Sequence, residues 1–358
     1  MISGFGNPQS IEREDHMPDS MEVKETNGPT IAVYGIYKNE EKFMERFLHS
    51  VQTADEIVLC DTGSNDNTNQ IIKQFKACCP HVNIKVYSIC VSPWRFDDAR
   101  NTSLSLVSPD IDICISLDID EYLMDGWKEH LRDHWEPGYT RYYHKFRTIW
   151  PAGNVSEHWH ERIHIRAGYT WKLPVHEILE YKGEEKIKRL EDFWVYQKPD
   201  YKKSRSSYLL LLEQSVKERK DVWKSWSFLA SEYLMAGRFE EALRAVDNAL
   251  QLNNSDKSYL HKVKYFVYRA QNQMDLAILS LNNAIFYMPH RREPYFEKAM
   301  YFHQLGRNAE AYFILKGSEK ITNKAIDYHY NPAAWDTEFE RWKSQLLELA
   351  KEEGINFA

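Results

Sequence analysis

The chain has 358 residues, of which 43% are hydrophobic and 28% charged, and its formal net charge is −7 at pH 7. This length allows two domains, and the acidic balance argues against non-specific attraction to nucleic acid or to an anionic membrane. No apolar run reaches the roughly 18 residues of a membrane-spanning helix. Five cysteines without a Cys-x-x-Cys pair favour reduced thiols over disulfides or zinc. We therefore expect a soluble, cytoplasmic protein, with residues 1–29 as a flexible polar tail and not a signal peptide.

Residues 30 to 117 alternate between short apolar runs and amphipathic segments. The runs with strand character are 31–37, 56–60, 82–88 and 111–117, and the segments with helical spacing are 41–50 and 67–77. This order predicts a parallel α/β sheet, in which ligands bind at the carboxyl ends of the strands. From 138 to 196 the helical signal fades and aromatic residues mix with His and Arg, which predicts strands and loops that close a pocket over those strand ends.

The chain turns helical after Ser204 and then repeats itself. A small residue opens the second helix of three successive helix-turn-helix units, at Ala242, Ala277 and Ala311. These alanines are 35 and 34 residues apart, which matches the period of the tetratricopeptide repeat. An ordinary helical bundle would look similar in one unit but not in three. Segment 336–351 can supply the polar-faced capping helix that a short repeat array needs.

An acidic turn, Asp118-Ile119-Asp120-Glu121, follows the apolar run that ends at Leu117. Alternate residues of a strand point to one side, so Asp118 and Asp120 can present two carboxylates together. Two like charges beside a buried strand need a positive charge between them, most simply Mn²⁺ or Mg²⁺ shared with substrate phosphates. A solvated turn is the simple alternative for an isolated Asp-x-Asp.

Four motifs occur in one order along the first half of the chain. They are Tyr37-Lys38-Asn39-Glu40-Glu41, Cys60-Asp61-Thr62-Gly63-Ser64-Asn65-Asp66-Asn67-Thr68, Trp94-Arg95-Phe96-Asp97-Asp98-Ala99-Arg100-Asn101 and the acidic turn. With the strands that precede them, they make the region from Thr30 to Glu180 resemble the family 2 glycosyltransferases of the GT-A fold. The resemblance implies an α/β fold with a GT-A, Rossmann-like, mostly parallel sheet at 30–200, followed by all-α tetratricopeptide-like repeats with a capping helix at 201–358.

The resemblance implies donor-binding roles for residues at the first two strand ends. Asp61 would bond the base or ribose of a nucleotide sugar, since a carboxylate can accept the ring N–H of uracil. Asn39 and Glu40 would line the nucleotide side of the cleft, and Trp94 could stack on a sugar. Helix capping is the alternative for Asn39 and for the polar residues of 63–68, and a place in the core is the alternative for Trp94.

The resemblance also implies the diphosphate and metal side of the site. Arg100 would supply the positive charge that an acidic protein needs to bind a diphosphate, or its guanidinium would donate hydrogen bonds to the Asp118 carboxylate. A surface ion pair is the alternative role for Arg100. Asp118 would face the ribose and the metal, and Asp120 would ligate the Mn²⁺ or Mg²⁺ that bridges the phosphates. The segment Trp171-Lys172-Leu173-Pro174-Val175-His176-Glu177 resembles one branch of these enzymes. It implies His176 as a third metal ligand, with a structural histidine as the alternative.

Inverting transfer requires a base that deprotonates the acceptor. The candidates are Glu177, Glu161, Glu121 and Asp125, and their spacing does not choose among them. We place Glu177 first because it shares a loop with His176, and keep Glu121 beside it. A salt bridge is the alternative role for Glu177.

These implications together predict a metal-dependent hexosyltransferase that moves a hexose from a nucleoside-diphosphate sugar, a UDP-sugar first, to an acceptor with inversion. Tetratricopeptide grooves usually hold peptides, so the expected acceptor is a peptide, protein or glycan, with a modified DNA base left open and a homodimer through the helical domain as a further option. The alternative is a non-catalytic, repeat-based binding protein with a vestigial nucleotide-sugar domain. A nucleotidyltransferase fits less well, because no Gly-rich, Lys-containing triphosphate loop follows the first strand.

Overall fold

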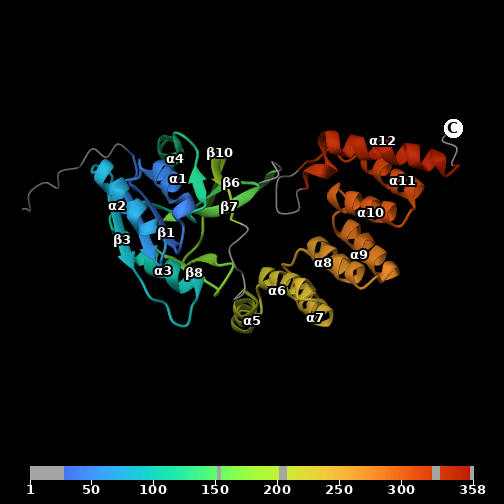
Figure 1. Cartoon of the computed structure of the whole chain (residues 1–358), viewed down its shortest axis with the longest axis horizontal. Helices are drawn as coiled ribbons and strands as arrows, with labels where there is room; N and C mark the ends of the chain where they lie inside the picture. The colour runs from blue at the N-terminus through green and yellow to red at the C-terminus, as the bar shows by residue number, and fades with distance from the viewer. Residues whose placement is uncertain (1–27, 151–154, 201–207, 325–330, 355–358) are drawn as a thin grey trace, which may run out of the picture.

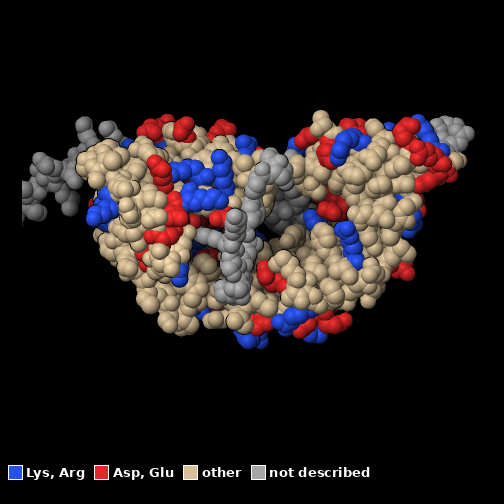
Figure 2. Space-filling model, viewed as in Figure 1, with Lys and Arg blue, Asp and Glu red and all other residues tan. Residues whose placement is uncertain are grey.

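The computed structural model describes residues 28–150, 155–200, 208–324 and 331–354. An α/β domain and a helical region lie side by side (Figure 1). Seen in space-filling form, the same face is hollowed between the two (Figure 2). The tail expected at residues 1–29 lies almost wholly outside the described residues, so it stays a prediction. No helix in the described ranges has the length and apolar character needed to span a bilayer.

The first half of the α/β domain alternates strands and helices as predicted, and it adds one helix, at 96–105, that was not predicted. Its elements are β1 (Ile31–Tyr37), α1 (Glu41–Val51), β2 (Glu56–Asp61), α2 (Thr68–Cys78), β3 (Ile84–Ser88), α3 (Phe96–Ser105) and β4 (Ile113–Ser116). Strands β3, β2, β1 and β4 pair in that order, all in parallel. Strands β1 and β2 are buried almost throughout. One face packs against α1 and α2 and the other against α3 and β8, which explains their unbroken apolar character.

The second half continues the same sheet. Its elements are β5 (Glu121–Leu123), α4 (Trp127–His134), β6 (Arg141–Ile149), β7 (Val155–Ile165), β8 (Tyr169–Lys172), β9 (Ile178–Tyr181) and β10 (Ile187–Gln197). The described sheet has the order β3-β2-β1-β4-β7-β6-β10-β5, and β7 runs antiparallel to both β4 and β6. The prediction of strands here is confirmed, but most of them do not have the expected role of closing a pocket over the strand ends. Strands β6, β7 and β10 extend the sheet itself, and only β8 and β9 form a separate two-stranded ribbon.

The helical region begins after the sheet and follows an arc, with α5 and α6 next to the α/β domain and α12 at the far end (Figure 1). Its elements are α5 (Tyr208–Glu218), α6 (Trp223–Met235), α7 (Phe239–Leu250), α8 (Lys257–Ala270), α9 (Met274–Tyr287), α10 (Glu293–Gln304), α11 (Asn308–Ser318), the 3₁₀ turn η1 (Pro332–Ala334) and α12 (Asp336–Glu352). The pairs α6/α7, α8/α9 and α10/α11 are the three predicted repeats, and α12 packs on α11 as the predicted cap.

The repeat period reflects the turn inside each helix pair. Ala242, Ala277 and Ala311 are each the fourth residue of the second helix and fully buried, where a larger side chain would hold the helices apart. The turn before that helix needs a left-handed residue, and the chain supplies Gly237, Asn272 and Gly306 there, with φ of 71°, 56° and 73°. The tetratricopeptide-like organisation is therefore confirmed by packing and by backbone geometry.

Candidate active site

The acidic turn lies at the carboxyl edge of the sheet, between β4 and β5. Its own backbone closes it, since the Glu121 amide donates to the Asp118 carbonyl at 3.0 Å. The Glu121 side chain is buried, and its Oε2 accepts the Asp118 amide at 2.9 Å. Ile119 is buried between the two aspartates. The Glu121 side chain therefore stabilises the turn by a hydrogen bond inside it. Asp118 and Asp120 lie on either side of the buried Ile119.

Two arginines converge on the Asp118 carboxylate. Arg100 Nη2 donates to one oxygen at 2.6 Å and Arg162 Nη1 to the other at 3.0 Å. Although burial opposes ionisation, these two guanidinium groups hold the pKa of Asp118 well below its usual range. Arg162 was not among the predicted site residues, and its only signal in the sequence was its place in the His- and Arg-rich stretch.

Arg100 joins Asp118 to the downstream loop. Its Nε donates to Glu177 Oε1 at 2.8 Å, and its guanidinium lies over the Trp171 ring at 5.2 Å. Burial works against the charge, but Asp118 and Glu177 together raise the pKa of Arg100. The structure thus brings Arg100, Asp118 and Glu177 into one network around the buried Arg100 side chain. The predicted fork of Arg100 onto Asp118 is present, and so is the salt-bridge alternative for Glu177.

Asp120 is held from two other elements. Its Oδ2 accepts from Gln197 Nε2 at 3.2 Å, at the end of β10. Its backbone carbonyl accepts from Arg46 Nη2 of α1 at 2.8 Å and from the Lys198 amide at 3.1 Å. Arg46 also lies over the ring of Tyr122 at 4.7 Å. These contacts fix the backbone of the turn and leave the half-buried Asp120 carboxylate at the strand ends.

Asp61 lies at the neighbouring strand end and is held by its own loop. Its Oδ1 accepts the amides of Gly63 and Ser64 at 3.0 and 2.8 Å, and its Oδ2 accepts Asn69 Nδ2 at 2.7 Å. Burial acts in the opposite direction, yet these hydrogen bonds lower the pKa of Asp61. Gly63 has φ of 102°, which lets the loop turn its amides toward the carboxylate.

The loops after β1 and β2 bind each other. Asn39 adopts φ of 56°; its amide donates to Ser64 Oγ, and its Oδ1 accepts the Asn65 amide at 2.8 Å. Asn39 therefore does not cap α1, because its side chain reaches across to the second loop. Capping of α2 comes from Asp66, whose Oδ1 accepts the Thr68 amide at 3.0 Å. The Glu40 amide donates to Thr68 Oγ1 at 2.8 Å, so the starts of α1 and α2 are joined beside Asp61.

The loop between β8 and β9 carries His176. The imidazole stacks on Phe228 of α6, with 3.9 Å between ring centroids and 14° between planes. Among the described residues, no group of three His, Cys, Asp or Glu side chains is arranged to hold a metal ion. The predicted set of Asp118, Asp120 and His176 is therefore not assembled here, and the individual metal-ligand assignments stay predictions.

The remaining base candidates lie apart from this network or inside the turn. Glu161 pairs with Arg141 at 3.3 Å on the sheet, and Asp125 is exposed between β5 and α4. Burial, reinforced by the two aspartates, raises the pKa of Glu121 although Arg162 opposes this. Trp94 meets Phe96 edge-on at 5.1 Å and packs against the helical region, so its position does not favour the sugar-stacking role.

Comparison with known proteins identifies the first domain. Residues 34–203 match the family model described as "Glycosyl transferase family 2". The chain contains a family 2 glycosyltransferase domain. The match begins within β1 and ends after β10, so it covers nearly the whole sheet. No curated protein matches the chain.

Solved structures resemble parts of this chain only weakly. "Crystal structure of MamA" is 13% identical and covers 41% of this chain and 88% of its own, with a TM-score of 0.29. "MamA AMB-1 P212121" is 20% identical over 32% of this chain and 66% of its own, with a TM-score of 0.27. "Crystal structure of MamA protein" is 14% identical over 40% and 78%, with a TM-score of 0.28. Scores this low carry no conclusion about fold or function.

Three histidines of the glycosyltransferase domain lie near Arg162, of which His144 is buried and His158 and His160 are half-buried. His144 and His160 face each other across β6 and β7 at 5.7 Å, and His158 follows at 5.6 Å from His160. Burial lowers the pKa of His144 to about 3 and that of His158 to about 4. These imidazoles are therefore neutral at pH 7. These histidines belong to the His- and Arg-rich stretch of the sequence, and none of them was among the predicted site residues.

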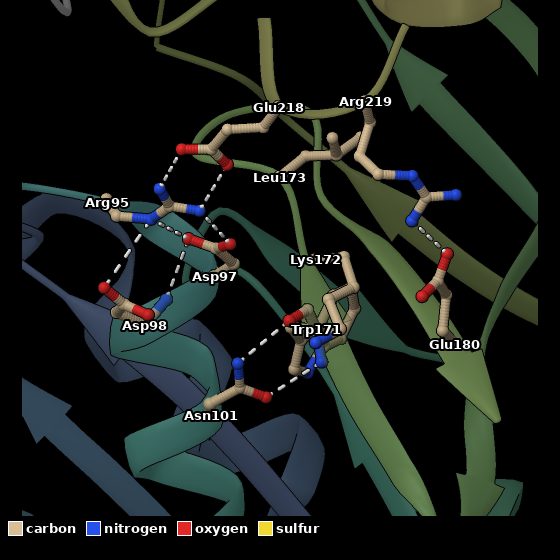
Figure 3. Close-up of a pocket in the computed structure, with 10 residues that line it drawn as sticks. All are labelled: Arg95, Asp97, Asp98, Asn101, Trp171, Lys172, Leu173, Glu180, Glu218 and Arg219. Atoms are coloured by element: carbon tan, nitrogen blue, oxygen red, sulfur yellow. Dashed lines mark hydrogen bonds and ion pairs between the residues drawn. The ribbon is translucent and has the colours of Figure 1, made fainter. Parts of the chain in front are cut away.

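A pocket of about 510 Å³ lies at the seam between the glycosyltransferase domain and α5 (Figure 3). Ion pairs lie at two places in the lining of this pocket. Arg95 binds Glu218 in bidentate fashion at 2.6 and 3.0 Å, and Arg219 binds Glu180 at 2.7 Å. Each pair joins the glycosyltransferase domain to the end of α5 or the residue after it. This pocket lies along α3 and β8, and neither Asp118 nor Asp120 lines it.

Proposed function

We propose that this chain is a metal-dependent hexosyltransferase that moves a hexose from a nucleoside-diphosphate sugar, a UDP-sugar first, to an acceptor with inversion. The observation that supports the proposal most is the Asp118–Arg100–Glu177 network beside Asp120, inside a family 2 glycosyltransferase domain. A solvated turn has no need of two arginines whose side chains are only 5% and 18% exposed. Such a network suits a site that must keep a carboxylate ionised and oriented toward a ligand.

The nucleoside half of the donor fits the strand ends of β1 and β2. Asp61 is ionised and held in place by amides, so an outward lone pair can accept the ring N–H of uracil. Asn39 and Glu40 lie on the adjoining loop, where their backbone is already fixed to the second loop. We propose that these three residues bind the base and ribose.

The diphosphate half fits the acidic turn. Divalent cations such as Mg²⁺ are bound by one or two carboxylates together with substrate phosphates, and Asp120 offers a half-buried carboxylate for this role. Asp118 fits the ribose better than the metal, because both of its oxygens already accept from arginines. Family 2 enzymes generally use a divalent metal, and Mn²⁺ or Mg²⁺ held by Asp120 would neutralise the leaving diphosphate.

The side chains around the turn then have separate tasks. Arg100 and Arg162 orient Asp118 and add positive charge to a chain whose net charge is −7. We propose Glu177 as the base that takes the acceptor's proton, because Arg100 holds its carboxylate next to Asp118 from a separate loop. Glu121 is the weaker candidate, since its carboxylate braces the turn. The acceptor, a peptide, protein, glycan or modified base, and the cytoplasmic location stay predictions.

Donor hydrolysis tests this function without knowledge of the acceptor. Purified protein is incubated with a panel of nucleotide sugars, with and without Mn²⁺, and nucleoside diphosphate release is measured. We expect one donor to be hydrolysed only with metal, and Asp120→Ala to abolish release. Asp192→Ala removes an exposed aspartate of β10 and should keep the wild-type rate. Absence of release and of any donor-induced thermal shift would favour the binding-protein alternative.

A further inference from the structure

The loop between β8 and β9 has a backbone that its own sequence does not favour. Leu173 has φ of 82° and His176 has φ of 52°, so two non-glycine residues within four positions are left-handed. Side chains adopt this region only where surrounding contacts hold them there. The conformation of this loop must therefore be imposed from outside.

The helical region supplies those outside contacts. Val175 is 2% exposed and packs within the core of α5 and α6, beside Leu212 and Leu229. His176 lies flat on Phe228 of α6 at 3.9 Å and meets Tyr208 of α5 edge-on at 5.9 Å. The α/β domain also holds the loop, because the Phe96 amide donates to the Pro174 carbonyl at 2.9 Å and Arg100 donates to Glu177 at 2.8 Å. The contacts of Val175 and His176 described above come from the helices.

The next residue of this loop belongs to the candidate active site. Glu177 accepts from Arg100 at 2.8 Å, and Arg100 donates to Asp118 at 2.6 Å. A continuous series of contacts therefore runs from α6 through the loop to the acidic turn. Contacts of this kind can carry energetic coupling between distant sites.

Ion pairs between the end of α5 and the α/β domain lie close to this series of contacts. Arg95 at the start of α3 binds Glu218 at the end of α5, and Arg219 binds Glu180 of β9 (Figure 3). Bidentate arginine pairs restrict orientation as well as distance. The end of α5 is thus tied to the start of α3 and to β9, and α6, which carries Phe228, follows α5 directly in the chain.

We propose that Phe228, in the helical region, is a positioning residue of the glycosyltransferase site. By stacking on His176 it fixes the loop, and the loop sets Glu177 and through Arg100 the orientation of Asp118. The helical repeats are then part of the catalytic unit. The effect on rate rests on the proposed function, whereas the effect on the loop does not.

Three substitutions at Phe228 and one control test the proposal. Phe228→Ala removes the ring, Phe228→Leu keeps apolar volume without a stacking face, and Phe228→Tyr restores the ring. Phe266 of α8 is another half-buried phenylalanine, packed on Tyr265 at 4.9 Å, so Phe266→Ala controls for a lost ring in the repeats. Amide hydrogen exchange of residues 173–178 and of the Phe96 amide reports the loop directly.

We expect Phe228→Ala to speed exchange of this segment at least about tenfold, and Phe228→Tyr to restore protection. Donor hydrolysis should lose about ten- to a hundredfold in kcat, with the donor KM within about threefold because Asp61 and its loop are untouched. Phe228→Leu should resemble Phe228→Ala, and Phe266→Ala should resemble the wild type in both measurements.

A double-mutant cycle with Glu177→Gln separates positioning from general destabilisation. If Phe228 acts through Glu177, Phe228→Ala should cost little further rate in the Glu177→Gln background. Additive losses, or unchanged exchange of residues 173–178, would overturn the proposal. If the wild type hydrolyses no donor, the proposed function fails, and the exchange measurements still decide whether Phe228 holds the loop.

Discussion

The two aspartates at the strand ends are held in opposite ways. Asp61 takes its hydrogen bonds from Gly63, Ser64 and Asn69, the farthest of them eight residues away. Asp118 takes its bonds from Arg100 and Arg162, which are 18 and 44 residues away. The first is a property of one loop, and the second exists only when α3 and β7 are both docked on the sheet.

This difference divides the candidate site into two halves with different sensitivities. The nucleoside half, around Asp61, should withstand changes elsewhere because its hydrogen bonds are local. The diphosphate half, around Asp118, should respond to changes in α3, β7 and the loop that carries Glu177. Substitutions and pH can therefore be used to perturb one half and leave the other intact.

Arg100→Ala should have the largest effect, because it removes the cation shared by Asp118 and Glu177. Breaking a buried ion pair costs about 3–5 kcal/mol, and we expect about 3 kcal/mol in the free energy of unfolding. The lower end applies because the Asp118 side chain is 34% exposed. Urea unfolding measures this value, and donor hydrolysis should fall to background.

Two further variants serve as comparisons for Arg100→Ala. Arg100→Lys keeps the charge but cannot fork to both carboxylates, so an intermediate loss is expected. Arg189→Ala removes an exposed arginine of β10 and should change stability by less than about 0.5 kcal/mol. Equal losses in Arg100→Ala and Arg189→Ala would show that the network contributes nothing to the fold.

Acidification should loosen the diphosphate half first. The pKa of His144 is about 3 in the folded protein and that of His158 is about 4, both lowered by burial. In the unfolded chain these histidines take up protons near pH 6.5. Their contribution to the free energy of unfolding is therefore fully present above pH 6.5 and is lost as the pH falls below it. The slope is about 1.4 kcal/mol per pH unit for each histidine. Asp61 has a lowered pKa and keeps its contribution until the pH approaches about 4.

Hydrogen exchange of β6 and β7 should therefore rise between pH 6.5 and 4.5, while exchange of β1 and β2 follows only at lower pH. His144→Phe removes one proton site and should flatten the stability curve. His144 Nε2 lies buried without a hydrogen-bond partner among the described residues, so a phenyl ring gives up only the 3.2 Å contact between Nδ1 and the Lys145 carbonyl. A uniform response of the whole sheet between pH 6.5 and 4.5 would contradict the division into halves.

The sequence predicts local features of this fold well. The strand-like runs up to Leu117 were recognisable because β1, β2 and β4 are buried on both faces and therefore uniformly apolar. Helix α3 escaped prediction because its buried face contains Asp97 and Arg100 beside Ala99 and Leu104, which hides the apolar stripe. A helix that buries charges for a site does not show the period of an ordinary amphipathic helix.

Long-range features were not predictable in the same way. Strand β7 pairs with β4 and β6, and the register shifts between Tyr142 and His144, so that Glu161 and Arg162 together face Tyr143. Which of these two side chains turns toward Asp118 depends on that irregularity, which no sequence period reveals. Arg100 was identified because it belongs to a family-like motif, whereas Arg162 required the structure.

Asparagine substitutions compare the two aspartates directly. In Asp61→Asn the amide oxygen can still accept from Gly63 and Ser64, so we expect a loss of about 1 kcal/mol in the free energy of unfolding. Asp118→Asn leaves two arginines facing a neutral group, and we expect about 2 kcal/mol. Equal losses from chemical denaturation of the two variants would remove the distinction between local and long-range bonding.

Substitutions of His176 should have the smallest effect on stability. They decide whether the imidazole acts by stacking or as a metal ligand. If the imidazole acts by stacking on Phe228, His176→Phe should keep the wild-type stability and metal dependence, and His176→Ala should lose about 1 kcal/mol. His176→Asn suits the left-handed backbone but has no ring, so it should resemble His176→Ala. If His176 is a metal ligand, both His176→Phe and His176→Ala should raise the Mn²⁺ concentration needed for donor hydrolysis. The Mn²⁺ titration of His176→Phe therefore separates the role that the family resemblance implies from the role that the helical region favours.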